Sequence, residues 1–499
     1  MSSDREVTRL AKQSTVYSIG TLIMKVGGLF ITPLYLDTNR FSVSAYGHLM
    51  LIEVTVNLMV ILIGLGLPQA TRRWGADERE DSLFEQSTLA SILVTLLVGS
   101  AVAAVAYVFQ RPLTTALLDA SAPAAALAWA GLYAALRAVS MQLMVYVRVK
   151  ERAAYTVGTQ SLELLVQLSL IAYVLLQGNA DLTTVVRIMA LTSLISPIVY
   201  LIGPASRVFT RPAWTQLSPM LVYGLPLLLS AAAGIILNVG DRYMVNLWYS
   251  AADVGTFGFA SRISSTLNML LIQGVTAAYG IVGLKSITAG RNDLQRRTIR
   301  HMAALYCWAA LVISLASHDG LTVLIEYFRV DASYREAVPL VFWMCLGSVF
   351  FGLSQLVINS LVAAKKSRTI SVIVVGSATL NLALNAVFIP WLGPIGAAYT
   401  TGISYAVFLL WSAIRVFQLE GISYRWERVI RTVLLVLLFY ALAQALLSLA
   451  TPLRIMLWIC LILLYPISLR LAGVYAASDV QDLLRLVRNR LHRPRHHAR

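Results

Sequence analysis

Long apolar stretches recur along almost the whole of this 499-residue chain. Each is long enough for a helix to cross roughly 30 Å of hydrocarbon. Only 13% of the residues are charged, against roughly a quarter in an average soluble domain. The sequence therefore predicts an all-α polytopic membrane protein, since helices satisfy their own backbone hydrogen bonds in lipid. We expect about fourteen spans, at 15–36, 45–67, 84–109, 124–147, 155–177, 183–206, 219–247, 253–284, 298–317, 337–363, 369–390, 394–417, 430–450 and 453–474.

Basic residues are distributed unevenly between the segments that join these spans. Lys and Arg concentrate in short cytoplasmic loops of membrane proteins. If the N-terminus is inside, most of them fall in inner segments, and this pattern predicts that both chain ends are cytoplasmic. The net charge of +16 then reflects this bias rather than a nucleic-acid surface. The outer segments hold only Arg40, Arg111, Arg329, Arg335 and Arg454.

Two halves of the chain resemble each other. The residues Ser44–Gly47 match Ala252–Gly255 at an offset of 208, and 147–167 match 364–385 with Glu163 over Asn381, at an offset of 218. Internal symmetry of this kind is typical of transporters, which bind substrate near the midplane between two bundles. We expect an N-lobe of spans 1–6 at 1–210, a C-lobe of spans 7–12 at 211–422, an appended pair at 423–476, and a basic amphipathic cytoplasmic tail at 477–499 suited to anionic membrane lipids.

Four basic side chains lie within the apolar runs of both halves. An ionised side chain at bilayer depth costs roughly 2.5–3.5 kcal/mol on insertion scales, so such residues usually face a cavity or a partner. Together they predict a cationic cavity that binds an anion. Alternatively, some extend to an interface or neutralise a carboxylate, Arg242 pairing with Asp241 and Lys25 with Glu53. The four are Lys25, Arg137, Arg242 and Arg262.

Acidic and amide side chains in the spans are the remaining candidates. Glu53, Glu163 and Asp241 are candidates for coupling transport to H⁺ or Na⁺, or else are structural counter-ions. The amides are candidates for contacts with a hydroxyl-rich cargo, although hydrogen bonding between helices explains them equally well. These amides are Gln355, Asn359, Asn381 and Asn385.

Motifs of enzyme sites are missing from the sequence. It contains no phosphate loop, no H-E-x-x-H zinc helix and no G-x-S-x-G elbow. The three cysteines lie far apart in apolar runs, so we expect no metal site and no cofactor. The longest extramembrane stretch, about 20 residues at 317–336, is too short for a catalytic domain. A non-enzymatic membrane protein is therefore favoured over a membrane glycosyl polymerase or ligase.

Three segments carry a resemblance to a known family. The stretches YGLPLLLSAAAGIILNVGDRYMVN at 223–246, VGTFGFASRI at 254–263 and SATLNLALNAVFIPWLGPIGAAYTTGISY at 377–405 resemble bacterial polysaccharide-repeat-unit flippases of the O-antigen (Wzx-like) type. These belong to the multidrug/oligosaccharidyl-lipid/polysaccharide (MOP) exporter superfamily. The last of these segments, at 377–405, includes Asn381 and Asn385 and is the most specific motif.

The resemblance implies a function and a fold. It implies a V-shaped bundle of two six-helix lobes in the bacterial inner membrane. The bundle would move undecaprenyl-pyrophosphate-linked oligosaccharides to the periplasmic leaflet for O-antigen, capsule or exopolysaccharide synthesis, upstream of a polysaccharide polymerase. The transport would use alternating access, driven by the membrane potential or by ion coupling. The appended pair resembles the lipid II branch, where such a pair helps hold the lipid tail, so a lipid II flippase or a drug/cation antiporter of the superfamily is the alternative.

The predicted orientation can be tested by labelling. Engineered cysteines near Ala180 and Asp253 should react with a membrane-impermeant thiol reagent added outside intact cells, because both sites lie in predicted outer segments. Sites near Gly75 and Arg291 should stay unlabelled until the membrane is permeabilised. Labelling near Arg291 in intact cells would reverse the orientation.

Overall fold

The computed structural model describes residues 20, 27–28, 31–77, 81–178, 180–276, 279 and 292–475. In these ranges the regular elements are helices, and the strand-like contact is a single bridge between Asp37 and Val330. Twelve described segments are long and apolar enough to cross a membrane, which confirms the all-α multi-pass class. The spans expected at 15–36 and 253–284 and the tail at 477–499 lie wholly or partly outside the described residues, so the count of fourteen stays a prediction.

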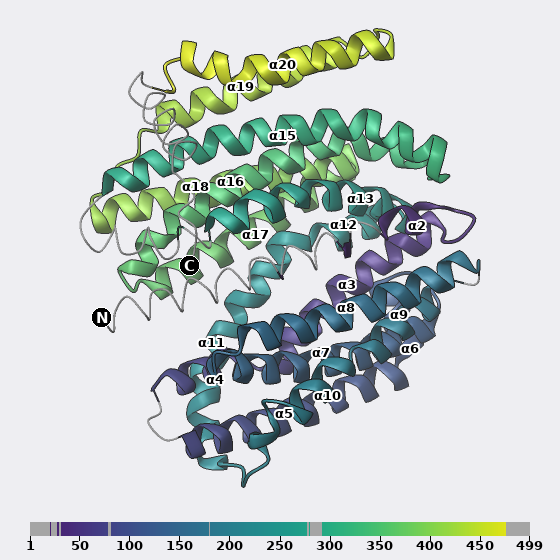
Figure 1. Ribbon diagram of the computed structural model, residues 1–499, viewed down its shortest axis with the longest axis vertical. Coiled ribbons are helices and arrows are strands. Elements are labelled where there is room, and N and C mark those ends of the chain that lie inside the picture. The colour runs from purple at the N-terminus through teal and green to yellow at the C-terminus, as the bar shows by residue number, and fades with distance from the viewer. Residues whose placement is uncertain are drawn as a thin grey trace, which may run out of the picture.

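The first group of helices, apart from the short α2, forms the lower half of Figure 1, and we call it the N-terminal bundle. Its centre is α7, where Ala126, Ala130, Ala134 and Ala138 form a buried stripe along one face. Small side chains let helices approach closely in a membrane, and α3, α5 and α9 pack around α7. The bundle contains α2 (Thr32–Leu36), α3 (Val43–Gly64), α4 (Leu67–Asp77), α5 (Asp81–Val108), α6 (Gln110–Leu117), α7 (Ala124–Val149), α8 (Ala153–Leu176), α9 (Leu182–Thr192) and α10 (Ile195–Ile202).

A second group, the C-terminal bundle, lies above the first in Figure 1. Its centre is α16, which packs closely against α18, with the backbones near each other at Gly347 and Gly402. The bundle contains α12 (Asp241–Trp248), α13 (Ala251–Leu267), η2 (Asn268–Ile272), α15 (Asn292–Phe328), η3 (Ala332–Ala337), α16 (Val338–Ala363), α17 (Ser367–Leu392) and α18 (Pro394–Glu420).

The helix α11 (Trp214–Val239) lies against both bundles. Its first half packs on α3, α4 and α5, where the Gly224 and Gly66 backbones touch and the Trp74 indole donates to the side-chain Oε1 of Gln216 at 3.1 Å. Its second half packs on α17. Gly66 has φ +73°, a conformation that favours glycine. The chain therefore passes from one bundle to the other within α11.

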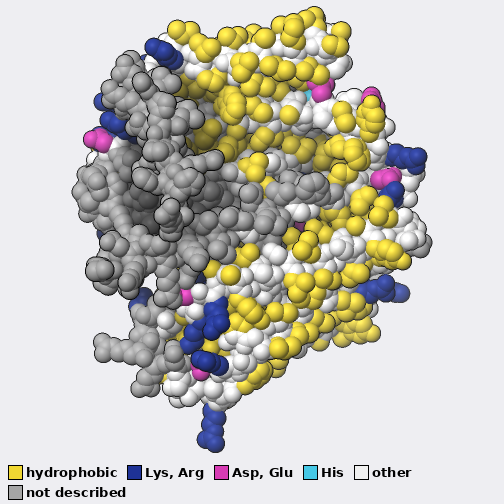
Figure 2. Space-filling view, in the orientation of Figure 1, with side chains coloured by type: hydrophobic (Ala, Val, Ile, Leu, Met, Phe, Trp, Pro, Cys, Tyr) yellow, Lys and Arg dark blue, Asp and Glu magenta, His cyan; other side chains and the backbone are white. Residues whose placement is uncertain are grey.

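Two further helices, α19 (Trp426–Ala445) and α20 (Thr451–Leu471), pack on the outer side of α15. The Trp308 indole donates to the Ile462 carbonyl at 3.1 Å, and the Tyr465 hydroxyl donates to the Thr432 carbonyl at 3.2 Å. Figure 2 shows hydrophobic side chains across this part of the surface, as expected for helices that face lipid.

Much of the stretch expected outside the membrane at 317–336 is helical, because α15 continues to Phe328. One expectation from the sequence is wrong in this region. Arg454 does not lie in an outer loop but in the first turn of α20. Its guanidinium forms a 2.5 Å ion pair with Asp319 of α15 and stacks 5.3 Å from the Trp458 ring. Arg454 therefore attaches the appended helices to the C-terminal bundle.

Arg454→Ala should lower the thermal stability of the purified protein. The change removes the arginine partner of the Asp319 carboxylate, which is only 20% exposed and keeps a longer contact of 3.3 Å to His318 Nδ1. A hydrogen bond to a charged group contributes about 1.5–3 kcal/mol. Arg111→Ala is the matched control, because Arg111 is exposed on α6. Thermal unfolding in detergent measures both variants, and equal midpoints would contradict the role given to Arg454.

Candidate functional site

A polar cavity of about 460 Å³ lies inside the C-terminal bundle. Its walls are the end of α11 and the helices α12, α13, η2, α16 and α18; among the described residues of the N-terminal half, Gly28 borders it. Ionisable, amide and hydroxyl groups line it although the surrounding helices are apolar. They include Asn238, Asp241, Arg242, Arg262, Asn268, Gln273 and Thr401.

Asp241 and Arg242 enter this cavity at the start of α12. Asp241 is 5% exposed; its Oδ2 accepts from the Thr401 hydroxyl at 3.2 Å and its Oδ1 has no partner among the described residues. Arg242 donates from one terminal nitrogen to Ser261 at 3.4 Å, and its Nε is likewise without a partner there. The ion pair between Asp241 and Arg242 that the sequence allows is not formed, so both groups retain capacity for a ligand.

Arg262 connects the cavity to the N-terminal bundle. It lines the cavity from α13, and two side chains of α3 approach its guanidinium. The Glu53 carboxylate lies 3.9 Å from one nitrogen, and the other nitrogen donates to the Tyr46 hydroxyl at 3.4 Å. Both contacts are long, and the two charged side chains stay partly exposed, Arg262 25% and Glu53 31%.

Arg137 and Glu163 form a second pair within the N-terminal bundle. Their closest atoms are 3.5 Å apart, and the Ser196 hydroxyl of α10 also donates to Glu163. The Glu163 side chain is buried, but 48% of the Arg137 side chain is exposed. Arg137 does not border the cavity described above, so the structure places Arg242 and Arg262 together and Arg137 apart from them. Lys25 lies outside the described residues.

The polar residues around Glu163 have counterparts in the second half of the chain. Between α8 and the α9–α10 pair, Glu163 contacts Ser196 and Gln167 contacts Thr192. Between α17 and α18, Asn381 contacts Ser404 and Asn385 contacts Thr400. The residues of α8 and α17 differ by an offset of 218, and their partners by 208. The overlay made from the sequence is thus reproduced by hydrogen bonds at equivalent positions.

The four candidate amides divide into two groups. Asn381 and Asn385 have no exposed surface and bond to each other and to α18, an arrangement that favours helix packing over sugar contact. Gln355 and Asn359 follow the cavity-lining Ser348 and Phe351 on the same face of α16. Their positions leave them as candidates for contact with a larger cargo.

Among the cavity residues that the sequence did not indicate, Asn238, Thr401 and Tyr405 hydrogen-bond within the site. The Tyr405 hydroxyl donates to the Asn238 side chain at 2.6 Å, and Thr401 binds Asp241. Asn238 lies three residues before Asp241 in one apolar run, and this helical spacing is a signal that could have indicated it. Tyr405 and Thr401 carry no such signal, because they meet α11 and α12 only through folding.

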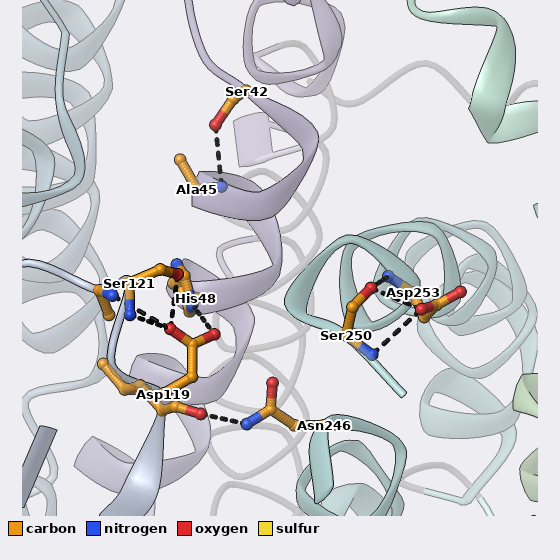
Figure 3. Close-up of polar contacts among 10 residues, drawn as sticks. Ser42, Ala45, His48, Asp119, Ser121, Asn246, Ser250 and Asp253 are labelled. Carbon is orange, nitrogen blue, oxygen red and sulfur yellow. Dashed lines mark hydrogen bonds and ion pairs between the residues drawn. The ribbon is translucent and has the colours of Figure 1, made fainter. Parts of the chain in front are cut away.

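The ends of α3 and α13 that we predict to face outside are packed together. A Cβ added to Gly47 would lie 1.6 Å from the Ala251 carbonyl oxygen, and one added to Gly255 would lie 2.6 Å from the Val43 oxygen. Gly47 and Gly255 are equivalent positions of the repeat. Ser42 and Ser250 cap the two helices, the second with Asp253 in a capping box (Figure 3). This contact closes the two bundles against each other at this end, and it joins the equivalent first turns of α3 and α13 through their backbones.

Side chains support this closure at the loop before α7. The Asn246 amide of α12 donates to the Leu118 carbonyl, and Asp119 next to it lies 2.7 Å from the His48 Nε2 of α3 (Figure 3). Burial alone would raise the pKa of Asp119, but hydrogen bonds from Ser121 and His48 outweigh it and hold that pKa below its usual range. The loop is therefore fixed to α3 while its carbonyl binds the opposite bundle.

The sequence profile of the polysaccharide biosynthesis protein family matches residues 10–279. The chain belongs to this family. A second profile, MatE, matches residues 226–387 of the same family member. A search of curated proteins returned no match.

Solved structures share the fold of this family member. A structure described as lipid II flippase MurJ in an inward closed conformation has a TM-score of 0.73 and 14% identity, and covers 91% of this chain and 98% of that one. An inward-facing multidrug resistance MATE transporter of the MOP superfamily has a TM-score of 0.61 and 16% identity, and the match covers 84% of this chain and 99% of that one. The MATE multidrug transporter DinF-BH has a TM-score of 0.57 and 15% identity, and the match covers 83% of this chain and 96% of that one. The fold is that of the MOP superfamily.

Gly47→Ala should destabilise the packed ends of α3 and α13. The new methyl group overlaps the Ala251 carbonyl, and overpacking of this kind costs about 1–3 kcal/mol. Gly320→Ala in α15 is the matched control, since a Cβ there meets nothing within 4 Å. The midpoint of thermal unfolding should fall for the first variant only; a fall of the same size in both would refute the close contact.

Proposed function

We propose that this family member is a flippase for undecaprenyl-pyrophosphate-linked oligosaccharide repeat units. It moves them from the cytoplasmic to the periplasmic leaflet of the bacterial inner membrane for assembly of a surface polysaccharide. The observation that carries the proposal is the pairing of Arg242 and Arg262 in one polar cavity. Guanidinium groups bind phosphate oxygens with two parallel hydrogen bonds, which suits a pyrophosphate head.

The charge of the cavity supports an anionic cargo. Two arginines and one carboxylate line it, so a cation would meet net repulsion and an anion net attraction. This balance argues against a drug/cation antiporter. The neutral groups Asn238, Gln273 and Tyr405 offer donors and acceptors for sugar hydroxyls. When an anionic head group moves out of a negative cell interior, the membrane potential lowers its free energy by about 2.3 kcal/mol per charge for each 100 mV. Asp241, Glu163 and Glu53 are the candidates for additional ion coupling.

The appended helices support a cargo with a polyprenyl tail. An apolar cleft of about 270 Å³ lies between α16, α18 and α19. It is lined by aliphatic and aromatic side chains, among them Phe350, Leu410, Trp426 and Leu434. An isoprenoid segment or an acyl chain matches this lining. A lipid II flippase, with the same pyrophosphate and a different head group, is the second candidate, because the fold matches MurJ over 91% of the chain.

Arg242→Ala should lower export of the polymer at least tenfold while the protein still inserts. The loss of a charged hydrogen-bonding partner costs about 1.5–3 kcal/mol, or roughly 10- to 100-fold in binding. Arg242→Lys should recover part of the activity, because an ammonium still attracts phosphate as a point charge but cannot form the two parallel hydrogen bonds of a guanidinium. Export is measured in a deletion strain by surface polysaccharide at matched protein levels.

Arg111→Ala is the control for this experiment, because Arg111 lies on the exposed face of α6. Asp241→Asn separates two roles: a mild effect indicates that Asp241 only orients its neighbours, and a loss equal to that of Arg242→Ala indicates ion coupling. Normal export from the double variant Arg242→Ala/Arg262→Ala would refute the cationic-cavity proposal.

A further inference from the structure

Arg262 belongs at once to the cavity and to the contact that closes the two bundles. We propose that Glu53 is a resident counter-ion of Arg262, which the pyrophosphate of the cargo displaces, and that this displacement releases the packed ends of α3 and α13. Glu53 then acts as a positioning residue that couples cavity occupancy to opening. The inference rests on the proposed function, since the displacing group is the pyrophosphate.

The position of the pair makes it part of the closure. Glu53 lies six residues after Gly47 in α3, and Arg262 lies seven residues after Gly255 in α13. Both are therefore roughly 10 Å further into the membrane than the contact between the glycine backbones, at the rise of an α-helix. The same two helices thus touch at their ends through glycine and at this depth through charge.

The contacts of Arg262 to the N-terminal bundle are exchangeable. The ion pair of 3.9 Å and the hydrogen bond of 3.4 Å to Tyr46 are at the long limit of such interactions. A phosphate can instead accept two short, parallel hydrogen bonds from a guanidinium. Since Arg262 also borders the cavity, a bound pyrophosphate reaches it without entering the interface. The anion and Glu53 therefore compete for one guanidinium.

Competition of this kind has a direct consequence for the conformation. A ligand shifts a conformational equilibrium by the difference between its affinities for the two states. The closed state makes Arg262 share its charge with Glu53, while the open state separates α3 from α13 and leaves Arg262 to the ligand. Pyrophosphate therefore favours opening. Without cargo the Glu53 contact is restored, which reduces opening of the empty protein.

Neutral hydrogen bonds between the bundles hold them in their relative position in the closed state. The Thr55 and Tyr243 hydroxyls of α3 and α12 share a hydrogen bond, and Asn246 binds the Leu118 carbonyl. These bonds do not border the cavity and carry no charge. The pair of Glu53 and Arg262 is the ionic contact between the bundles that the described residues provide at the cavity, so cargo charge acts on it.

The test follows the distance between the packed ends. Spin labels are placed at Ala120→Cys and Leu247→Cys, both exposed and next to the Leu118–Asn246 contact, in full-length protein whose Cys307, Cys345 and Cys460 are replaced. Glu53→Gln should increase the population of long distances about fivefold without ligand, the lower range for coupling between sites. Tyr46→Phe, which keeps the packing, should shift it in the same direction. Glu427→Gln, an exposed carboxylate of α19, is the matched control.

Binding of inorganic pyrophosphate supplies the second readout, with sulfate at equal ionic strength as the reference. Pyrophosphate should open the wild-type protein, and Glu53→Gln should bind it about fivefold more tightly, because linkage between sites is reciprocal. A merely structural Glu53 would not tighten binding. Unchanged distances in both Glu53→Gln and Tyr46→Phe, with pyrophosphate bound normally, overturn the counter-ion role. Absence of pyrophosphate binding by the wild type overturns the cargo assignment and the displacement step, whatever the distances in Glu53→Gln.

Discussion

The free-energy cost of a charge in hydrocarbon governs where this protein places its ionisable groups. Arg137 and Arg262 each lie beside a carboxylate of another helix, and Arg454 does so at the attachment of α20. Arg242 and Asp241 remain without a mutual pair but border a polar cavity. Such a cavity is the other environment in which an ionised group is tolerated at this depth. Charge placement therefore separates the structural pairs of Arg137 and Arg454 from a cavity with free binding capacity, and Arg262 both pairs with Glu53 and borders that cavity.

The two halves of the chain form hydrogen bonds between helices at equivalent positions, but with different residue types. The bonds of Glu163 and Gln167 to Ser196 and Thr192 are repeated by Asn381 and Asn385 with Ser404 and Thr400. The second set is neutral, whereas Glu163 of the first set binds Arg137. The cavity lies in the half whose helix contacts are neutral. The repeat thus preserves the scaffold while the charged groups diverge.

Much of the fold follows from local properties of the sequence. The lengths of apolar runs predicted the described spanning helices, and the overlay of the halves predicted the equivalence of Glu163 and Asn381, because both depend on residues close together in the chain. The limits of α15 and the place of Arg454 were not predicted. The extension of α15 to Phe328 and the ion pair between Arg454 and Asp319, 135 residues apart in the chain, depend on packing between distant segments.

The candidate site divides in the same way. The sequence by itself determined which basic side chains lie within apolar runs of membrane-spanning length, since hydropathy and the cost of burying charge act on each run separately. Only the tertiary structure decided their partners: Arg242 and Arg262 share a cavity with Asn238, Thr401 and Tyr405, and Arg137 lies elsewhere with Glu163. It also decided that Arg262 meets Glu53 across the two bundles. Helix rotation and crossing set these contacts, and both arise from packing between segments that are distant in the chain.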